Sequence, residues 1–244
     1  MWIRNNLSFV MCHLSSLRTS GEEALPDFLR GAMRSRPFVK ICGVTNPDDA
    51  LAAIESGADA LGFNLFPGSK RFLQLDSARE WISALPPQIA RVAVGVNPVL
   101  AEVEDWLAGD LFHALQLHGE SWYPLATRLV ATPKPLIAAI QVRLDTRQPF
   151  DVEWFPGFAV MFDGYREGDF GGTGETFPWA LLARFKIDKP LILAGGLRAE
   201  NVQAAIETTS PYAVDVATGV ESRPGKKDHA KMRDFIAAVR EAAP

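Results

Sequence analysis

Short apolar runs alternate with amphipathic stretches from residue 38 to the end of the chain. Most of these runs are almost continuously hydrophobic, which is typical of parallel strands that are covered on both faces. We expect eight strands, at residues 38–42, 60–63, 92–96, 114–117, 136–140, 158–162, 191–194 and 213–216.

The stretches between the runs carry helix signals. In the first, Asn46 can cap the helix, Pro47 suits its first turn, and Gly57 can end it in a left-handed conformation. The segment at 145–154 is weak as a helix, so we expect a short or irregular fifth crossover. The other helices are expected at 77–85, 100–107, 122–130, 179–185, 200–206 and 231–239.

Strands that alternate with helices predict a parallel sheet, and eight repeats favour its closure into a barrel. We therefore predict an α/β fold, a single (β/α)8 TIM barrel over residues 37–244. An open doubly wound sheet is the competing fold, but it expects a glycine-rich phosphate loop after the first strand, where the chain has only Gly43.

Residues 1–36 do not show this alternation of apolar runs and helical stretches, and Met33 lies just ahead of the first strand. We expect this segment to be a disordered extension, or the result of a start codon assigned too far upstream, and therefore to be dispensable. A secretory signal is disfavoured because the short apolar run near the start is broken by polar residues and no small-residue cleavage site follows.

Composition narrows the classes of function. The 244 residues carry a net charge of −4, which provides no basic surplus for binding nucleic acid. Two cysteines cannot build a disulfide framework, so we expect a cytoplasmic protein. No apolar stretch approaches the roughly 18 residues of a membrane span, so no membrane partner is expected.

In a barrel the active site lies at the carboxyl ends of the strands. Glycines after the seventh and eighth strands can bring backbone N–H groups close to a phosphate. A carboxylate that ends a buried strand, as Asp163 does, needs a partner or a function. A strand-ending cysteine such as Cys42 is by itself more often a small apolar residue. The carboxyl-end rule selects Cys42, Asn64, Asn97, His118, Asp163, Gly195, Gly196, Thr218 and Gly219.

Two other kinds of site find no support in the sequence. A Walker phosphate loop is absent because Val220 stands where the first glycine before Gly225-Lys226 is required. The four histidines are scattered and no metal-ligand spacing occurs, so no metal site is expected. Asp215 lies within the eighth strand, where an inward carboxylate more often orients a neighbouring group than does chemistry.

Several motifs, taken together and in order, resemble those of the phosphoribosylanthranilate isomerase family. They begin with Lys40-Ile41-Cys42-Gly43-Val44-Thr45 and cover nearly the whole chain from Val39 onward. The others are residues 57–63, Ser69-Lys70-Arg71-Phe72, Leu115-Gln116-Leu117-His118-Gly119-Glu120, residues 171–179, Ala194-Gly195-Gly196-Leu197, residues 200–202, residues 214–221 and residues 224–229.

The resemblance implies an Amadori rearrangement of N-(5′-phosphoribosyl)anthranilate, a phosphorylated small molecule, in tryptophan biosynthesis. It implies Asp163 as the acid that protonates the furanose oxygen and Cys42, as a thiolate, as the base at C2′. It also implies that Arg71 clamps the anthranilate carboxylate, and that no cofactor is required. The further residues expected to bind substrate are His118, Gly171, Gly172, Gly195, Gly196, Asp215, Thr218 and Gly219.

The chain departs from the family pattern at four positions. Gly68 and Lys70 change the loop before Arg71, Gly95 replaces a bulky residue, and Ala217 replaces a serine. Two alternatives stay open: another phosphosugar isomerase, such as one of the imidazole-ribotide type, and a silent phosphosugar-binding barrel. Cys42 in place of a first-strand aspartate counts against the first, and the pairing of Cys42 with Asp163 counts against the second.

Overall fold

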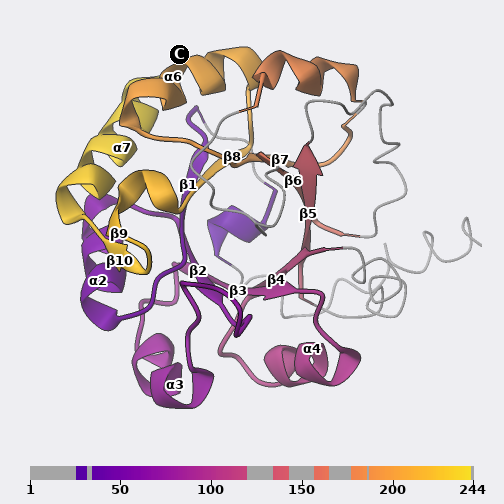
Figure 1. Ribbon diagram of the computed structural model, residues 1–244, viewed down its shortest axis with the longest axis vertical. Coiled ribbons are helices and arrows are strands. Elements are labelled where there is room, and N and C mark those ends of the chain that lie inside the picture. Colours follow the sequence, from indigo (N-terminus) through magenta and orange to yellow (C-terminus); the bar gives the residue numbers. More distant parts are fainter. Residues whose placement is uncertain are drawn as a thin grey trace, which may run out of the picture.

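The computed structural model describes residues 26–31, 35–119, 134–142, 157–164, 177–185 and 187–242. Eight parallel strands form a closed barrel in chain order, β1 to β8, and helices surround it (Figure 1). The predicted (β/α)8 barrel is therefore confirmed. The strands are β1 Phe38–Cys42, β2 Ala60–Asn64, β3 Ala90–Val96, β4 Ala114–His118, β5 Leu136–Val142, β6 Ala159–Gly164, β7 Leu191–Leu193 and β8 Ala213–Val216.

The first helix shows why its sequence folds as expected. The Asn46 side chain accepts a hydrogen bond from the Asp49 backbone N–H, and Gly57 ends the helix with φ 101°. The stretch at 179–185 forms a 3-10 helix, η4, rather than the expected α-helix, while the expected elements at 122–130 and 145–154 lie outside the described residues. The helices are α2 Pro47–Ser56, α3 Leu75–Ser83, α4 Leu100–Leu107, η4 Trp179–Arg184, α6 Ala199–Thr209, η5 Thr218–Val220 and α7 His229–Glu241.

The barrel interior changes character along its axis. At the amino ends of the strands it is apolar, with Phe38 and Tyr212 in tilted contact at a ring-centroid distance of 5.0 Å. Toward the carboxyl ends several of the buried side chains are polar. They include Lys40, Gln116, His118, Asp163 and Asp215.

A short 3-10 helix, η2 Asp27–Leu29, lies within the ring of strands in the view of Figure 1. Phe28 and Leu29 are buried, and the Tyr212 hydroxyl donates a hydrogen bond of 2.7 Å to the Phe28 carbonyl oxygen. This part of the supposed extension therefore packs against the amino end of the barrel, because its two apolar side chains leave water there. Residues 1–25 and 32–34, which were also expected to be disordered and dispensable, lie outside the described residues.

A two-stranded antiparallel hairpin, β9 Glu221–Arg223 and β10 Lys226–Lys227, follows η5. Thr45, which follows β1, donates a hydrogen bond from its hydroxyl to the Gly225 carbonyl oxygen in the hairpin turn. The hairpin was not foreseen from the sequence. It places charged side chains beside the carboxyl end of β1.

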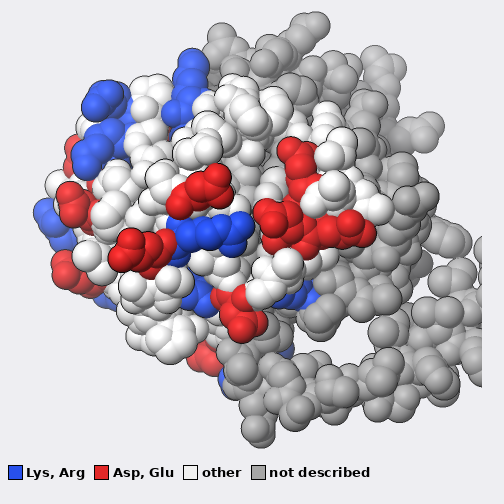
Figure 2. Space-filling model, turned by 90° about the horizontal axis from the view of Figure 1, so that it is seen from below, with Lys and Arg blue, Asp and Glu red and all other residues white. Residues whose placement is uncertain are grey.

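One face of the molecule carries charges of both signs. On the described part of the face seen in Figure 2, lysine and arginine lie among aspartate and glutamate on the left, and a group of acidic side chains lies right of centre. Within the described ranges, no helix has the length and apolar character needed to cross a membrane.

Candidate active site

The two residues expected to be catalytic end two strands of the same barrel. Cys42 ends β1 and Asp163 lies near the end of β6, and both are buried. Burial and the nearby Asp215 raise the pKa of the Asp163 carboxyl to about 7. At neutral pH a substantial fraction of Asp163 is therefore protonated, as a general acid must be.

The surroundings of Cys42 shift the pKa of its thiol in opposite directions. Burial and Asp215 raise its pKa, while Lys40 and Lys227 oppose them only in part, so the pKa stays above its ordinary value. The protonated thiol is consequently the major form in the free protein. Both Cys42 and Asp163 share Lys40, Asp215 and Arg71 as charged neighbours.

Asp215 forms a buried ion pair with Lys40. The two residues are opposite each other in the register of β8 and β1, and Lys40 Nζ lies 2.5 Å from Asp215 Oδ1. The Lys40 side chain has no exposure to solvent. Burial lowers the pKa of Lys40, but Asp215 and Cys42 outweigh it and leave the pKa raised. Lys40 is therefore a cation. The group that neighbours Asp215 is this ammonium, and the orienting role of Asp215 stays a prediction.

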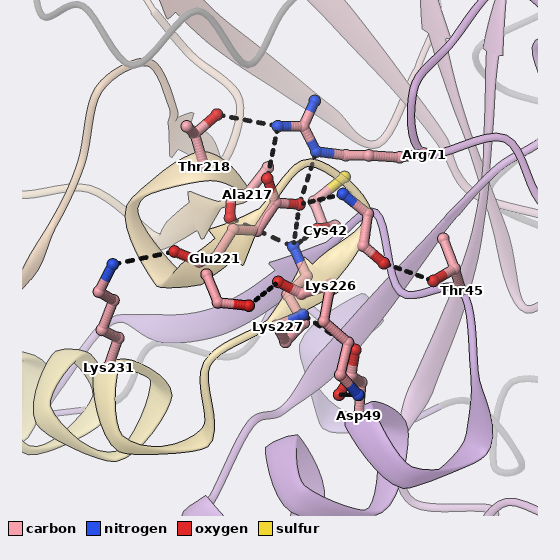
Figure 3. A network of polar contacts seen from close by, with 12 residues as sticks. Cys42, Thr45, Asp49, Arg71, Ala217, Thr218, Glu221, Lys226, Lys227 and Lys231 are labelled. Atoms are coloured by element: carbon pink, nitrogen blue, oxygen red, sulfur yellow. Dashed lines mark hydrogen bonds and ion pairs between the residues drawn. The ribbon is translucent and has the colours of Figure 1, made fainter.

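Arg71 is held by an internal carboxylate. Its Nε and Nη2 donate to the two carboxylate oxygens of Glu221 at 2.7 and 2.8 Å, and Nη2 also donates to Thr218 Oγ1 at 3.0 Å. Nη1 forms no hydrogen bond with another described residue (Figure 3). One edge of the guanidinium is thus occupied, and only Nη1 is left for an incoming anion.

Lys227 connects this pair to the first strand. Its buried Nζ donates to the Cys42 carbonyl oxygen at 2.5 Å, to the Ala217 carbonyl oxygen at 3.2 Å and to Glu221 Oε1 at 3.1 Å (Figure 3). The Lys227 N–H also donates to Asp49, which is buried in the first turn of α2. The network therefore fixes the hairpin, the end of β1 and the Arg71 side chain relative to one another.

His118 ends β4 beside Gln116. Burial and the Lys40 charge lower the pKa of His118 to about 4, so the ring is neutral at pH 7. Its Nε2 lies 2.8 Å from Gln116 Nε2, while Nδ1 has no hydrogen-bond partner among the described residues. An amide donor at Nε2 places the ring proton on Nδ1, which is buried.

The glycine loops after β7 and β8 meet. A Cβ at Gly219 would lie 1.9 Å from the Leu197 carbonyl oxygen, so the close approach of the loops itself requires glycine there. Gly195 and Gly196 have φ values of 86° and 63°, in the left-handed region. Six of the expected site residues line one small cavity between these loops: Asp163, Gly195, Gly196, Asp215, Thr218 and Gly219. Gly171 and Gly172 lie outside the described residues.

The sequence interpretation gave no role to Lys40, Gln116, Glu221 or Lys227. Lys40 left a readable signal, because a lysine two positions before Cys42 in a buried strand faces the same side as the thiol. Glu221 and Lys227 left none, since their contacts depend on how the hairpin folds back. Asn64 and Asn97 were also among the strand-end residues selected from the sequence. Asn64 ends β2, and Asn97 follows β3 and lies close to Gly119.

One departure from the family pattern has a packing explanation. A Cβ at Gly95 would lie 2.7 Å from Cζ3 of Trp106, so the indole of α4 fills the space that a bulky residue on β3 would need.

The family model described as "N-(5'phosphoribosyl)anthranilate (PRA) isomerase" matches residues 39–238. The chain belongs to this family. A curated member from Pseudomonas fluorescens, named N-(5'-phosphoribosyl)anthranilate isomerase, is 44% identical over 202 residues, which are 82% of this chain and 97% of that protein. The matched residues thus span nearly the whole length of that relative.

Solved structures of the isomerase family agree. The phosphoribosyl anthranilate isomerase of Thermus thermophilus has a TM-score of 0.72 and 37% identity, covering 84% of this chain and 98% of that one. A second isomerase structure, in complex with reduced 1-(o-carboxyphenylamino)-1-deoxyribulose 5-phosphate, has a TM-score of 0.67 and 37% identity over 84% and 99% of the two chains.

Proposed function

We propose that the chain catalyses the reaction for which its family is named, the isomerisation of N-(5′-phosphoribosyl)anthranilate to 1-(2-carboxyphenylamino)-1-deoxyribulose 5-phosphate in tryptophan biosynthesis. The observation that carries the proposal is the placement of Cys42 and Asp163 around one buried ion pair. An Amadori rearrangement needs an acid and a base at different atoms of the same sugar, and these two strand ends offer one of each.

In the first step Asp163 donates its proton to the furanose ring oxygen. The bond between that oxygen and C1′ breaks, and the amine lone pair forms a protonated imine. A carboxyl with a pKa of about 7 suits this step because it is protonated in part near neutrality and gives up its proton readily.

In the second step the Cys42 thiolate takes the proton from C2′. The electron pair of the C2′–H bond moves toward the imine and gives an enolamine, which becomes the ketone product by tautomerisation. Removal of a proton requires the thiolate form, so the small thiolate fraction of Cys42 limits this step.

Substrate anions would be held at two places. The anthranilate carboxylate meets Nη1 of Arg71, the part of the guanidinium that Glu221 leaves open. The phosphate rests on backbone N–H groups of the loops at Gly195-Gly196 and Thr218-Gly219, close to the start of α6. Asp215 acts on the substrate through Lys40, and the neutral His118 at the end of β4 is the further substrate-binding side chain.

A direct assay tests the proposal. The substrate is fluorescent through its aromatic ring, so its loss can be followed when it is mixed with the purified chain. Rapid loss with formation of the deoxyribulose phosphate supports the isomerase. Binding without turnover would indicate a silent phosphosugar-binding barrel, and turnover of an imidazole ribotide in its place would indicate the histidine-pathway type of isomerase.

A further inference from the structure

Lys40 and Cys42 lie on the same side of β1. They are two residues apart on the strand, so both side chains point into the barrel. Lys40 Nζ is held at 2.5 Å by Asp215, and the Lys40 ammonium and the Cys42 thiol influence each other's pKa. The ammonium therefore lies near both the carboxylate of β8 and the thiol at the mouth of the barrel.

The neighbouring strand makes room for this arrangement. A Cβ on Gly62 of β2 would lie 2.8 Å from Cys42 Sγ and 2.9 Å from Lys40 Nζ. Both atoms therefore occupy the space above Gly62, which a side chain at that position would fill. Gly62 has the same strand register as Cys42. Only glycine at this position allows the ammonium and the sulfur to approach each other on the inner face of the sheet.

Stability alone does not account for a buried lysine here. Desolvation of two ions costs about as much as their attraction returns, and apolar replacements of such pairs are often neutral or stabilising. The amino ends of the strands show the apolar solution, where Phe38 packs against Phe28 and Tyr212. Lys40 lies at the level where the barrel interior changes from apolar to polar.

We propose that Lys40 is a positioning residue that holds the thiolate of Cys42 over the substrate, with Asp215 fixing the ammonium and Gly62 leaving the space for it. This inference rests on the proposed function, because it assumes that Cys42 is the base at C2′. The proton moves from C2′ to the sulfur, and Lys40 stays protonated throughout because its pKa is raised. An ammonium donor beside the sulfur stabilises the anion and not the neutral thiol.

Other charged groups surround the same thiol and set the background for the test. Lys227 of β10 and Arg71 carry positive charge toward it, and Asp215 of β8 carries negative charge. The remaining groups around the site are Asp163 of β6, Glu221 of β9 and the neutral His118 of β4.

The experiment measures thiol reactivity apart from catalysis. The chain has two cysteines, so Cys12→Ala leaves Cys42 as the only thiol, and its alkylation by iodoacetamide is followed from pH 6 to 10. In this background Lys40→Met should slow alkylation about ten-fold or more at pH 8, because each unit of thiol pKa changes the thiolate fraction about ten-fold. kcat should fall about as far, with KM nearly unchanged.

Three variants sharpen the result. Lys40→Arg keeps a cation and should restore much of the thiol reactivity. Lys189→Met, which removes a lysine bound to the Gly157 carbonyl oxygen at the other end of the barrel, should leave reactivity and kcat unchanged. Lys40→Met combined with Asp215→Asn removes both charges and preserves the test if the single variant does not fold. It should still lower kcat, because the cation beside the sulfur is missing, while alkylation should change less because the opposing effect of Asp215 is removed as well.

Unchanged alkylation in folded Lys40→Met would overturn the positioning role. If that variant does not fold, unchanged kcat in the double variant would overturn it. Slow alkylation in Lys40→Met would support the electrostatic effect of Lys40 on the thiol. If Cys42→Ser nevertheless kept full turnover, the role of Cys42 as the base would be overturned. The two results are distinct because alkylation needs no substrate.

Discussion

The two ends of the barrel are built from the same strands but from opposite chemistry. At the amino end, Phe28, Phe38 and Tyr212 form a contiguous aromatic cluster, and the buried Tyr212 hydroxyl bonds to the Phe28 backbone. At the carboxyl end the interior holds Lys40, Asp215 and Asp163, all nearly excluded from water.

The comparison separates stability from function within one fold. Aromatic burial stabilises by roughly 25 cal/mol per Å² of apolar surface removed from water and needs no partner of defined charge. Buried ions stabilise little on balance, and each must keep its partners. We therefore expect changes at the amino end to alter the unfolding temperature and changes at the carboxyl end to alter turnover.

The largest effect is expected at the catalytic pair. Asp163→Asn cannot donate a carboxylic proton and should fail at ring opening, while Cys42→Ser should fail at proton removal from C2′. General acid–base assistance supplies about 10²–10⁴-fold, so kcat should drop by that factor with little change in KM. A substrate deuterated at C2′ should show an isotope effect in Cys42→Ser and little in Asp163→Asn. Near-normal turnover in either variant would remove that residue from the mechanism.

The amino end should show the reverse pattern. Phe28→Ala removes a fully buried ring, a change that typically costs about 3–5 kcal/mol. Each kcal/mol corresponds to about 2–4 °C in a chain of this size, so the melting temperature should fall by about 6 °C or more while kcat stays the same. Leu51→Ala, at a half-exposed leucine on α2, is the matched control and should change little. A chain that melts normally without the Phe28 ring would show that η2 adds nothing to stability.

The Arg71 network should show both effects at a smaller scale. Arg71→Ala removes a charge-assisted contact worth roughly 1.5–3 kcal/mol, so KM should rise about ten-fold or more. The same change leaves Glu221 with fewer donors, so we also expect a modest loss of stability. Glu221→Gln should raise KM less, because it loosens Arg71 without removing it. Arg79→Ala, at an exposed pair on α3, is the control, and an unchanged KM in Arg71→Ala would place the carboxylate elsewhere.

The pH dependence should reveal the unusual order of the two pKa values. Activity requires protonated Asp163, with a pKa of about 7, and ionised Cys42, whose pKa lies above its ordinary value. As pH rises toward 7, kcat/KM should increase because thiolate accumulates while Asp163 is still protonated. It should then level off, since gain of thiolate and loss of the acid cancel, and fall once Cys42 is fully ionised.

Asp163→Asn isolates the cause of the bend near pH 7. Its residual kcat/KM should keep rising through pH 7, because no acid is left to titrate there. A wild-type profile that already falls as pH rises above 7 would mean that the thiol ionises at or below the pKa of Asp163.

The positions of the strands were the feature that the sequence predicted most accurately. Phe38–Cys42 and Ala213–Val216 have the bounds that their apolar runs predict, because strands covered on both faces select hydrophobic residues throughout. The 3-10 helix at Trp179–Arg184 shows the limit, since a short helical pattern after a proline does not specify the helix type. The cytoplasmic location stays a prediction from the cysteine count.

By itself the sequence determined the eight-fold alternation and the edge of the barrel at which chemistry occurs. These follow from local patterns, because a residue that ends a parallel strand always reaches the same edge. The choice of Cys42 and Asp163 from the strand-end residues came from the resemblance to the family. Only the tertiary structure decided which charges meet. Lys40 pairs with Asp215, 175 residues away in the sequence, and Arg71 pairs with Glu221, 150 residues away. Ion pairing in the interior is set by barrel closure and by the hairpin, so the state of the thiol and the open face of the arginine depend on contacts that no local pattern records.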